Sequence, residues 1–166
     1  MAGAHTLAET ERQVTDRLAG MAIDFTAMAV ASNLFRAATA VRNHLERSVL
    51  APHGLSWTAF VVLWVVWIWE PIETRQIAEE GGFSKATLTG VLSTLENRKL
   101  AIRKKSKEDG RLVLVELTPA GRKLMQELFP EFNQQEQFVA GAVPTDKQDE
   151  LAKALRLITA NIEKND

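Results

Sequence analysis

The stretch from Ser84 to Leu117 reads SKATLTGVLSTLENRKLAIRKKSKEDGRLVLVEL and gives the strongest local pattern in the chain. In its first half, apolar residues recur at helical spacing on one face. In its second half, the period changes to two, and a charged turn ending in Asp-Gly separates two short runs. The pattern therefore predicts a helix followed by a two-stranded antiparallel hairpin.

Basic side chains are concentrated in this stretch. Between Lys85 and Arg111 the chain has eight Lys or Arg residues and three Asp or Glu residues, a local charge of +5, whereas all 166 residues together carry −1. The rest of the chain therefore sums to −6. A basic helix and hairpin on an otherwise acidic chain are typical of a nucleic-acid-binding surface. A solvated charged hairpin with no partner is the alternative.

Length and composition narrow the class of protein. A chain of 166 residues with 46% hydrophobic content fits one globular domain. The lack of cysteine excludes disulfides, thiolate metal sites and cysteine nucleophiles. The first twenty residues lack an apolar leader, and the apolar run Trp57–Trp69 has 13 residues where a bilayer span needs about 20. We therefore expect a cytoplasmic protein with no membrane partner.

The flanking segments are predicted to be helical. A polar helix is expected over 7–18, and Asp24 is a suitable N-cap for a helix to about residue 50. Such a helix is nearly 40 Å long, so we expect it to pack against a second subunit. Thr118-Pro119 begins another helix, bent by Pro130, and Thr145 with Gln148 predicts a capping box for the last one.

Two short helices precede the hairpin. One is expected over 73–80, and Ser84 caps the next after a turn at Gly81-Gly82, where glycine tolerates positive φ. A helix, a short turn and a second helix form a helix-turn-helix, whose second helix enters the major groove of DNA.

This order of elements resembles the multiple-antibiotic-resistance regulator (MarR) family of winged-helix transcription factors. The most specific motif is Asp109-Gly110-Arg111 followed by the letters LTPAG at 117–121, and Thr87-Leu88-Thr89 and Leu95-Glu96 also match. The resemblance implies a mainly α fold with a small β wing in one domain, 1–166. Residues 56–118 would form the winged helix-turn-helix, and 24–50 and 119–164 the dimerisation helices. Gly90 stands where the family often has Arg, and Lys99 where it commonly has Gly.

The function implied is regulation of transcription. We expect a homodimer that binds a pseudo-palindromic operator in double-stranded DNA and acts as a repressor. A small aromatic or phenolic acid would release the dimer from the operator, and no cofactor is expected. The alternatives are a metal-responsive regulator of the same fold, using His44 or His53 with a carboxylate, and a helical adaptor that binds no DNA. No nucleophile–base pair or glycine-rich phosphate loop is visible, so we do not expect an enzyme.

The DNA-binding residues are expected on the second helix of the motif and on the wing. Small residues on the helix would approach the bases, the basic residues would bind phosphates, and Arg111 would enter the minor groove, oriented by Asp109. The helix residues are Ser84, Lys85, Thr87, Thr89, Gly90 and Ser93, and the wing and phosphate residues are Arg75, Gln76, Lys104, Lys105, Lys107 and Arg111.

A candidate ligand site involves the helix Trp57–Trp69, which is apolar nearly all round and must be covered on both sides. Either the N-terminal segment or a partner subunit covers it, or an aromatic pocket lies beside the long first helix. The residues expected to line that pocket are Phe35, Arg42, His44, Trp57, Val61 and Trp64.

Overall fold

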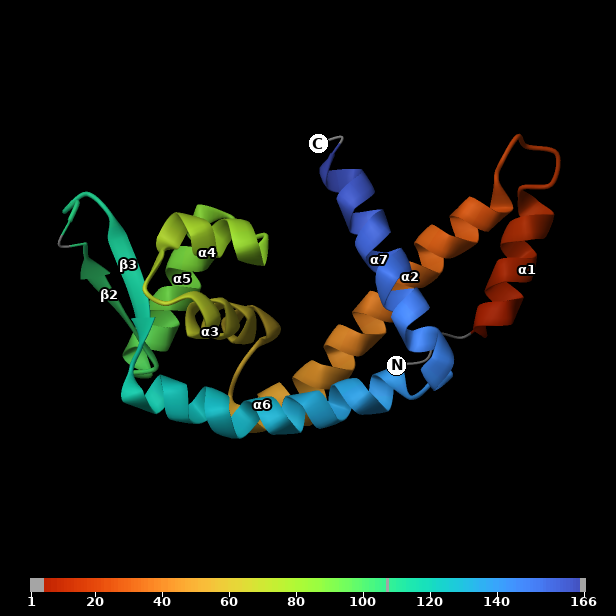
Figure 1. The fold of residues 1–166 in the computed structure, drawn as a ribbon. Helices are drawn as coiled ribbons and strands as arrows, with labels where there is room; N and C mark the ends of the chain where they lie inside the picture. Colours follow the sequence, from red (N-terminus) through yellow and green to blue (C-terminus); the bar gives the residue numbers. More distant parts are fainter. Residues whose placement is uncertain (1–4, 107, 165–166) are drawn as a thin grey trace. The chain divides into compact units, whose positions relative to one another are not determined.

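The computed structural model describes residues 5–106 and 108–164, which form helices and a three-stranded antiparallel sheet (Figure 1). The chain divides into two compact units, one up to Val41 and the other from Arg42 onward. The mainly α fold with a β wing is confirmed, and the single domain over 1–166 stays a prediction. The elements are α1 (Leu7–Arg17), α2 (Phe25–Leu45), α3 (Trp57–Trp69), α4 (Thr74–Gly81), α5 (Lys85–Asn97), α6 (Pro119–Ala140), α7 (Thr145–Glu163), β1 (Ile72–Glu73), β2 (Ala101–Lys105) and β3 (Val113–Leu117).

The first unit contains α1 and most of α2. Thr6 caps α1 in a capping box with Glu9, and Asp24 caps α2 by accepting a hydrogen bond from the backbone N–H of Ala27 at 2.9 Å. The side chain of Asn33 donates to Glu11 at 3.1 Å and joins the two helices. The helix predicted over 7–18 is therefore confirmed, and so is the start of the helix predicted from Asp24.

The long helix predicted over 24–50 changes character before it ends. The α-helical part stops at Leu45, a π-helical turn follows over Glu46–Leu50, and a 3₁₀ turn covers Ala51–His53. Pro52 lacks the N–H that the carbonyl of Ser48 would need in a regular α-helix, so the α pattern cannot continue to this point. Gly54, at φ 64°, ends the segment.

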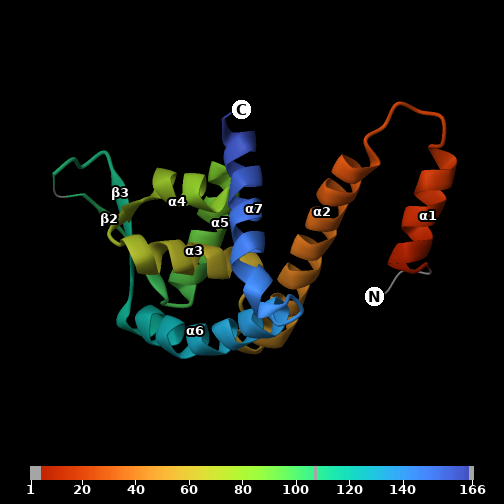
Figure 2. The ribbon, with the colours of Figure 1, turned by 45° about the vertical axis from the view of Figure 1, so that its right-hand side comes forward.

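The core of the second unit is built around α3. Val62, Leu63 and Val66 of this helix are fully buried, and α4, α5, α6 and β3 all contact it. Figures 1 and 2 show α4 and α5 beside α3, with α6 starting at the end of β3 away from the hairpin tip. The apolar face predicted for α5 is confirmed at Leu88, Leu92 and Leu95, which are buried, whereas Val91, also predicted to point inward, is half-buried.

The predicted hairpin is present, with a third strand. β2 pairs with β3 in the register Arg103 to Val115. β3 begins at Val113, although the alternating pattern after Asp109-Gly110 predicts a strand from Arg111. β1 pairs with the other side of β3 through Ile72 and Val115. The sequence did not predict β1, because a strand of two residues is too short to show a period.

The first turn of helix α6 packs against the backbone of Lys99 and Leu100. Thr118 caps it by accepting from the N–H of Gly121 at 3.0 Å, and the Thr118 hydroxyl donates to the carbonyl of Lys99 at 2.6 Å. A Cβ on Gly121 would lie 2.0 Å from the carbonyl oxygen of Leu100, so only glycine fits there. The helix continues through Pro130 along a curved course (Figure 1).

The capping box predicted for the last helix is wrong. The N-cap of α7 is Pro144, with no side-chain cap. The Gln148 amide instead donates to the carbonyls of Ala140 and Val143, both at 3.1 Å, and fixes the turn between α6 and α7.

In the described part of the chain, no single helix is long and apolar enough to cross a bilayer, although the consecutive helices at 25–53 and 57–69 meet that criterion together as a broken span.

Lys99 provides a test of the turn from α5 into the wing. Its φ is 57°, a left-handed conformation that costs a residue with a Cβ about 1–2 kcal/mol. We expect Lys99→Gly to raise the free energy of unfolding by about 0.5–1 kcal/mol, because the entropy of glycine in the unfolded chain offsets part of the gain. Urea denaturation at fixed protein concentration measures this. Asn97→Gly, in the helical part of α5, is the control and should lower the free energy of unfolding. A lower free energy of unfolding in both variants would contradict the prediction for Lys99.

Candidate nucleic-acid interface

The start of α5 is fixed by its cap. Gly82 adopts φ 64° and ends α4, and the Ser84 hydroxyl accepts from the N–H of Thr87 at 3.1 Å. The hydroxyls of Ser84 and Thr87 also bond to each other at 2.8 Å. Lys85 follows directly and is exposed. The helix N-terminus, its positive dipole end and a lysine therefore lie together on the surface, which favours an anion such as phosphate.

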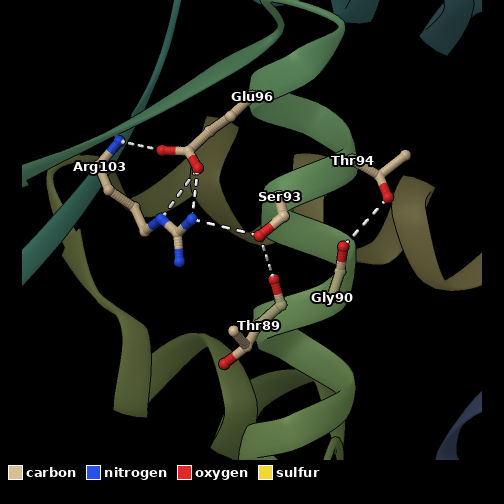
Figure 3. A network of polar contacts seen from close by, with 6 residues as sticks. All are labelled: Thr89, Gly90, Ser93, Thr94, Glu96 and Arg103. Atoms are coloured by element: carbon tan, nitrogen blue, oxygen red, sulfur yellow. Dashed lines mark hydrogen bonds and ion pairs between the residues drawn. The ribbon is translucent and has the colours of Figure 1, made fainter.

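The outward face of α5 is small and uncharged. Gly90 is exposed, and a Cβ placed there would meet nothing within 4 Å. Thr89 and Thr94 are exposed beside it, and Ser93 is half-buried. Each of the three hydroxyls donates to the carbonyl four residues earlier in the helix. Figure 3 shows two of these bonds, from Ser93 to Thr89 and from Thr94 to Gly90. A flat surface of this kind allows close approach of another backbone.

A charged pair fastens α5 to the wing (Figure 3). Arg103 of β2 donates from Nε to Glu96 Oε2 at 3.0 Å and from its backbone N–H to Oε1 at 3.1 Å. Its Nη2 also donates to the Ser93 hydroxyl at 3.4 Å. The hydrogen bond from the Arg103 side chain lowers the pKa of Glu96. The sequence analysis missed this pair; the only available signal was an acid and a base at opposite ends of the helix-to-strand turn.

Arg98 makes a second connection that the sequence analysis missed. Its guanidinium donates to the carbonyl of Gly54 at 2.7 Å and to that of His53 at 2.8 Å. These carbonyls end the segment that continues α2, where the helix dipole is negative. The end of α5 is thereby tied to the turn before α3.

The wing carries the basic residues, several of them already paired. Arg111 donates from Nε and Nη2 to the two carboxylate oxygens of Asp109, each at 3.1 Å, so the expected contact is present. These hydrogen bonds lower the pKa of Asp109. Lys104 pairs with Glu116 across the hairpin at 2.8 Å, and Lys105 is exposed. Lys107, also expected to bind phosphate, lies outside the described residues.

The two candidate phosphate residues on α4 have intramolecular partners. Arg75 Nε donates to Glu79 at 2.7 Å one helical turn away, with 84% of its side chain exposed. The Gln76 side chain accepts from the backbone N–H of Glu73 at 3.2 Å, as part of the capping box of α4. Gln76 therefore caps its own helix, a role that its position three residues after Glu73 could have indicated.

A groove of about 620 Å³ lies beside the recognition helix α5. Residues of α4, α5 and the hairpin line it, among them Arg75, Lys85, Thr89, Arg103 and Val113. The groove thus brings together three residues that the sequence assigned to the interface, Arg75 of α4 and Lys85 and Thr89 of α5, and adds Arg103 and Val113 of the hairpin, which the sequence did not assign to it.

The aromatic side of α3 is covered by α6. The Trp64 ring stacks on Phe129 at 4.6 Å between centroids, and Trp57 lies 6.4 Å from Phe132. Val61 is half-buried on the same helix. This cover differs from the N-terminal segment or partner subunit expected from the sequence.

The other candidate ligand residues, His44, Arg42 and Phe35, each have different surroundings. His44 Nε2 and Gln135 Oε1 are hydrogen-bonded at 2.8 Å, and the His44 ring lies 5.3 Å from Phe138. Arg42 is exposed at the start of the second unit, whereas Phe35, 75% exposed, belongs to the first. His53 lies 3.5 Å from Glu131. No group of three or more His, Cys, Asp or Glu side chains within residues 5–106 and 108–164 is arranged to hold a metal ion.

The chain is similar to known transcriptional regulators in sequence and in fold. The model of the MarR family matches residues 55–113. The uncharacterized HTH-type transcriptional regulator YwaE of Bacillus subtilis is 37% identical over 140 residues, which cover 84% of this chain and 82% of that protein. The structure of AbsC, a MarR family transcriptional regulator from Streptomyces coelicolor, matches with a TM-score of 0.77 at 21% identity, over 86% of this chain and 97% of that one. BpsR of Bordetella bronchiseptica, whose DNA binding is regulated by 6-hydroxynicotinic acid, matches with a TM-score of 0.71 at 27% identity, over 78% and 92%.

The pair between Glu96 and Arg103 predicts an acid-dependent stability. Because the pKa of Glu96 is lowered from 4.5 in the folded chain, its stabilisation is present above that value and is lost as the pH falls through the folded pKa. We expect Glu96→Gln to lower the free energy of unfolding by about 1 kcal/mol at pH 7, and the difference from the parent to shrink as the pH falls from 4.5 through the lowered pKa of Glu96. Urea denaturation across this pH range measures it, with Glu127→Gln on α6 as the control. A constant difference at all pH values would rule out the charged pair as its source.

Proposed function

Because the chain belongs to the MarR family of transcription regulators, we propose that it represses transcription as a homodimer bound to a pseudo-palindromic operator in double-stranded DNA. The observation that carries the proposal is the joint placement of α5 and the basic hairpin on one side of the same unit, fastened by Glu96 and Arg103. A helix and a wing held in fixed relation suit a duplex, whose groove and backbone are also in fixed relation. We also propose a cytoplasmic location, since that is where such a partner would be met.

In the proposed complex, α5 lies in the major groove. The open surface at Gly90 brings the helix backbone close to the bases, and Lys85 at the helix start binds phosphate. On the wing, Arg111 enters the adjacent minor groove, where a narrow A·T-rich segment attracts a guanidinium group. Asp109 already holds that side chain through two hydrogen bonds. Arg75, Lys104 and Lys105 contribute phosphate contacts.

The exposed apolar residues of the C-terminal helices support the homodimer. In α7 no residue is buried, and Leu151, Leu155 and Ile162 are 45%, 38% and 55% exposed. Phe138, near the end of α6, is 69% exposed. Apolar side chains repeated along a helix are stabilised when a partner covers them. A second copy would do so and would present two recognition helices about 34 Å apart, one turn of DNA.

We further propose that a small aromatic or phenolic acid releases the operator. The support is BpsR, which is similar to this chain and whose DNA binding responds to 6-hydroxynicotinic acid. On this chain the ligand would contact the aromatic side of α3, near Trp57, Val61 and Trp64, with His44 and Arg42 available for its carboxylate. Since Trp64 stacks on Phe129 of α6, a ligand there would change how α6 packs against α3.

DNA binding by the wing is tested with Arg111→Ala. We expect affinity for duplexes with A·T-rich flanks to fall about tenfold, because an arginine contact with DNA is worth roughly 1–3 kcal/mol. The dependence of log affinity on log salt should also become shallower. Fluorescence anisotropy with a labelled operator duplex at several salt concentrations measures both.

Lys123→Ala is the matched control for charge. Lys123 is exposed on α6 and paired with Glu127 at 3.8 Å, so the variant loses one charge outside the hairpin. Its affinity should match that of the parent. An equal loss of affinity in both variants would mean that the wing contributes only nonspecific charge to DNA binding. Binding to heparin as tight as to duplex DNA would instead favour the helical adaptor.

The ligand proposal is tested by tryptophan fluorescence. Titration with aromatic acids, 6-hydroxynicotinic acid among them, should quench emission and shift operator affinity over the same concentration range. Trp57→Phe and Trp64→Phe should each reduce the quenching, whereas Trp69→Phe, a change at an exposed residue beyond the aromatic cluster, should not. If every acid leaves emission and DNA affinity unchanged while Zn²⁺ alters both, the metal-responsive alternative through His44 or His53 gains support.

A further inference from the structure

The hydroxyl groups in the middle of α5 already donate their hydrogens to backbone carbonyls of the same helix. Thr89 Oγ1 donates to the carbonyl of Lys85 at 2.8 Å, Ser93 Oγ to that of Thr89 at 3.0 Å, and Thr94 Oγ1 to that of Gly90 at 3.1 Å. A carbonyl oxygen only accepts, so the direction of each bond is fixed. Each of these hydroxyls therefore offers only lone pairs to anything outside the helix.

The oxygen of Ser93 differs from the other two. It also accepts a hydrogen bond from Arg103 Nη2 at 3.4 Å, from the wing side of the helix (Figure 3). The Ser93 hydroxyl donates its hydrogen to the helix and accepts a hydrogen bond from Arg103, so it has little capacity for another partner. Thr89 and Thr94 are the exposed hydroxyls in this part of the helix with no such donor among the described contacts.

Other hydrogen-bond donors are missing from the same part of the sequence. Between Ala86 and Glu96 the chain has no Lys, Arg, Asn or Gln, and Gly90 contributes no side chain. The base atoms that such donors bind in the major groove are O6 and N7 of guanine, N7 of adenine and O4 of thymine. The hydrogen-bond donors that the DNA itself presents in this groove are the exocyclic amino groups at N6 of adenine and N4 of cytosine.

Hydrogen-bond counting decides which contact is favoured. A threonine that turns its hydrogen toward a base acceptor exchanges one bond for another and gains nothing net. A threonine that accepts from a base amino group keeps its bond to the helix and adds a second. The difference is one hydrogen bond.

We propose that Thr89 and Thr94 act as hydrogen-bond acceptors for exocyclic amino groups, adenine N6 or cytosine N4, in the major groove of the operator. This inference rests on the proposed function, since it requires α5 to lie in the groove. It makes these two threonines specificity-determining residues, whereas Ser93, whose oxygen already accepts from Arg103, is not assigned a base contact.

Base analogues test the proposal on the intact protein. The probe is a duplex selected from a random library by the full-length protein. At single positions, adenine is replaced by purine, which lacks the N6 amino group, or by 7-deazaadenine, which lacks N7; cytosine is replaced by 2-pyrimidinone, which lacks the N4 amino group. We expect removal of an amino group to weaken binding about fivefold at one or two positions in each half-site. Removal of N7 at those positions should change affinity less than twofold.

Threonine variants assign the contacts. Thr89→Val and Thr94→Val keep the shape and methyl group of the side chain but remove the oxygen. Each should weaken binding to the parent duplex and become insensitive to the loss of one amino group. Thr15→Val on α1 is the matched control, because Thr15 is exposed and donates to the carbonyl of Glu11 at 2.9 Å in the same way. It should behave as the parent protein.

The outcomes separate this inference from the proposed function. A selected duplex that tolerates every amino deletion but is weakened by loss of N7 would overturn the acceptor role and leave operator binding intact. Failure of the protein to select any duplex would overturn both. The base-analogue measurement uses the parent protein, so it holds even if a valine variant does not fold.

Discussion

The contact between Gly121 and Leu100 is the constraint on which the second unit depends. The backbone of the first turn of α6 lies against the carbonyl of Leu100, in a space where a Cβ would be 2.0 Å from the oxygen. Thr118 reinforces the contact by bonding to the carbonyl of Lys99. Glu70, at the end of α3, accepts from the N–H of Leu117 at 2.6 Å and pairs with Arg122. The recognition helix, the wing and α6 therefore meet at one junction of close backbone contacts.

That junction gives the recognition helix little freedom to move by itself. Arg98 ties its end to the carbonyls of His53 and Gly54, and Glu96 ties its last turn to Arg103 of β2. A displacement of α6 or of the turn before α3 would consequently be transmitted to α5 as a rigid movement. Such coupling through packed elements is how a change at one site alters the geometry of another.

The sequence predicted the parts of the fold that have a local cause. The Ser84 cap, the turn at Gly82 and the apolar face of α5 all depend on neighbouring residues, and all are confirmed. β1 and the stacking of Trp64 on Phe129 depend on pairing between distant segments, which leaves no periodic signal. At the candidate interface, residue types indicated which side chains are present, whereas the partners of Arg103 and Lys104 required the register of β2 against α5 and β3.

The ion pairs of the wing and of α4 also affect how the protein meets nucleic acid at a distance. Arg75, Lys104 and Arg111 each have a carboxylate neighbour, so each brings its own counterion. Compensated charges produce a weak field beyond a Debye length, about 8–10 Å in physiological salt. In the proposed complex, these three cations would therefore act at close range, by direct contact with DNA, more than by attraction from afar.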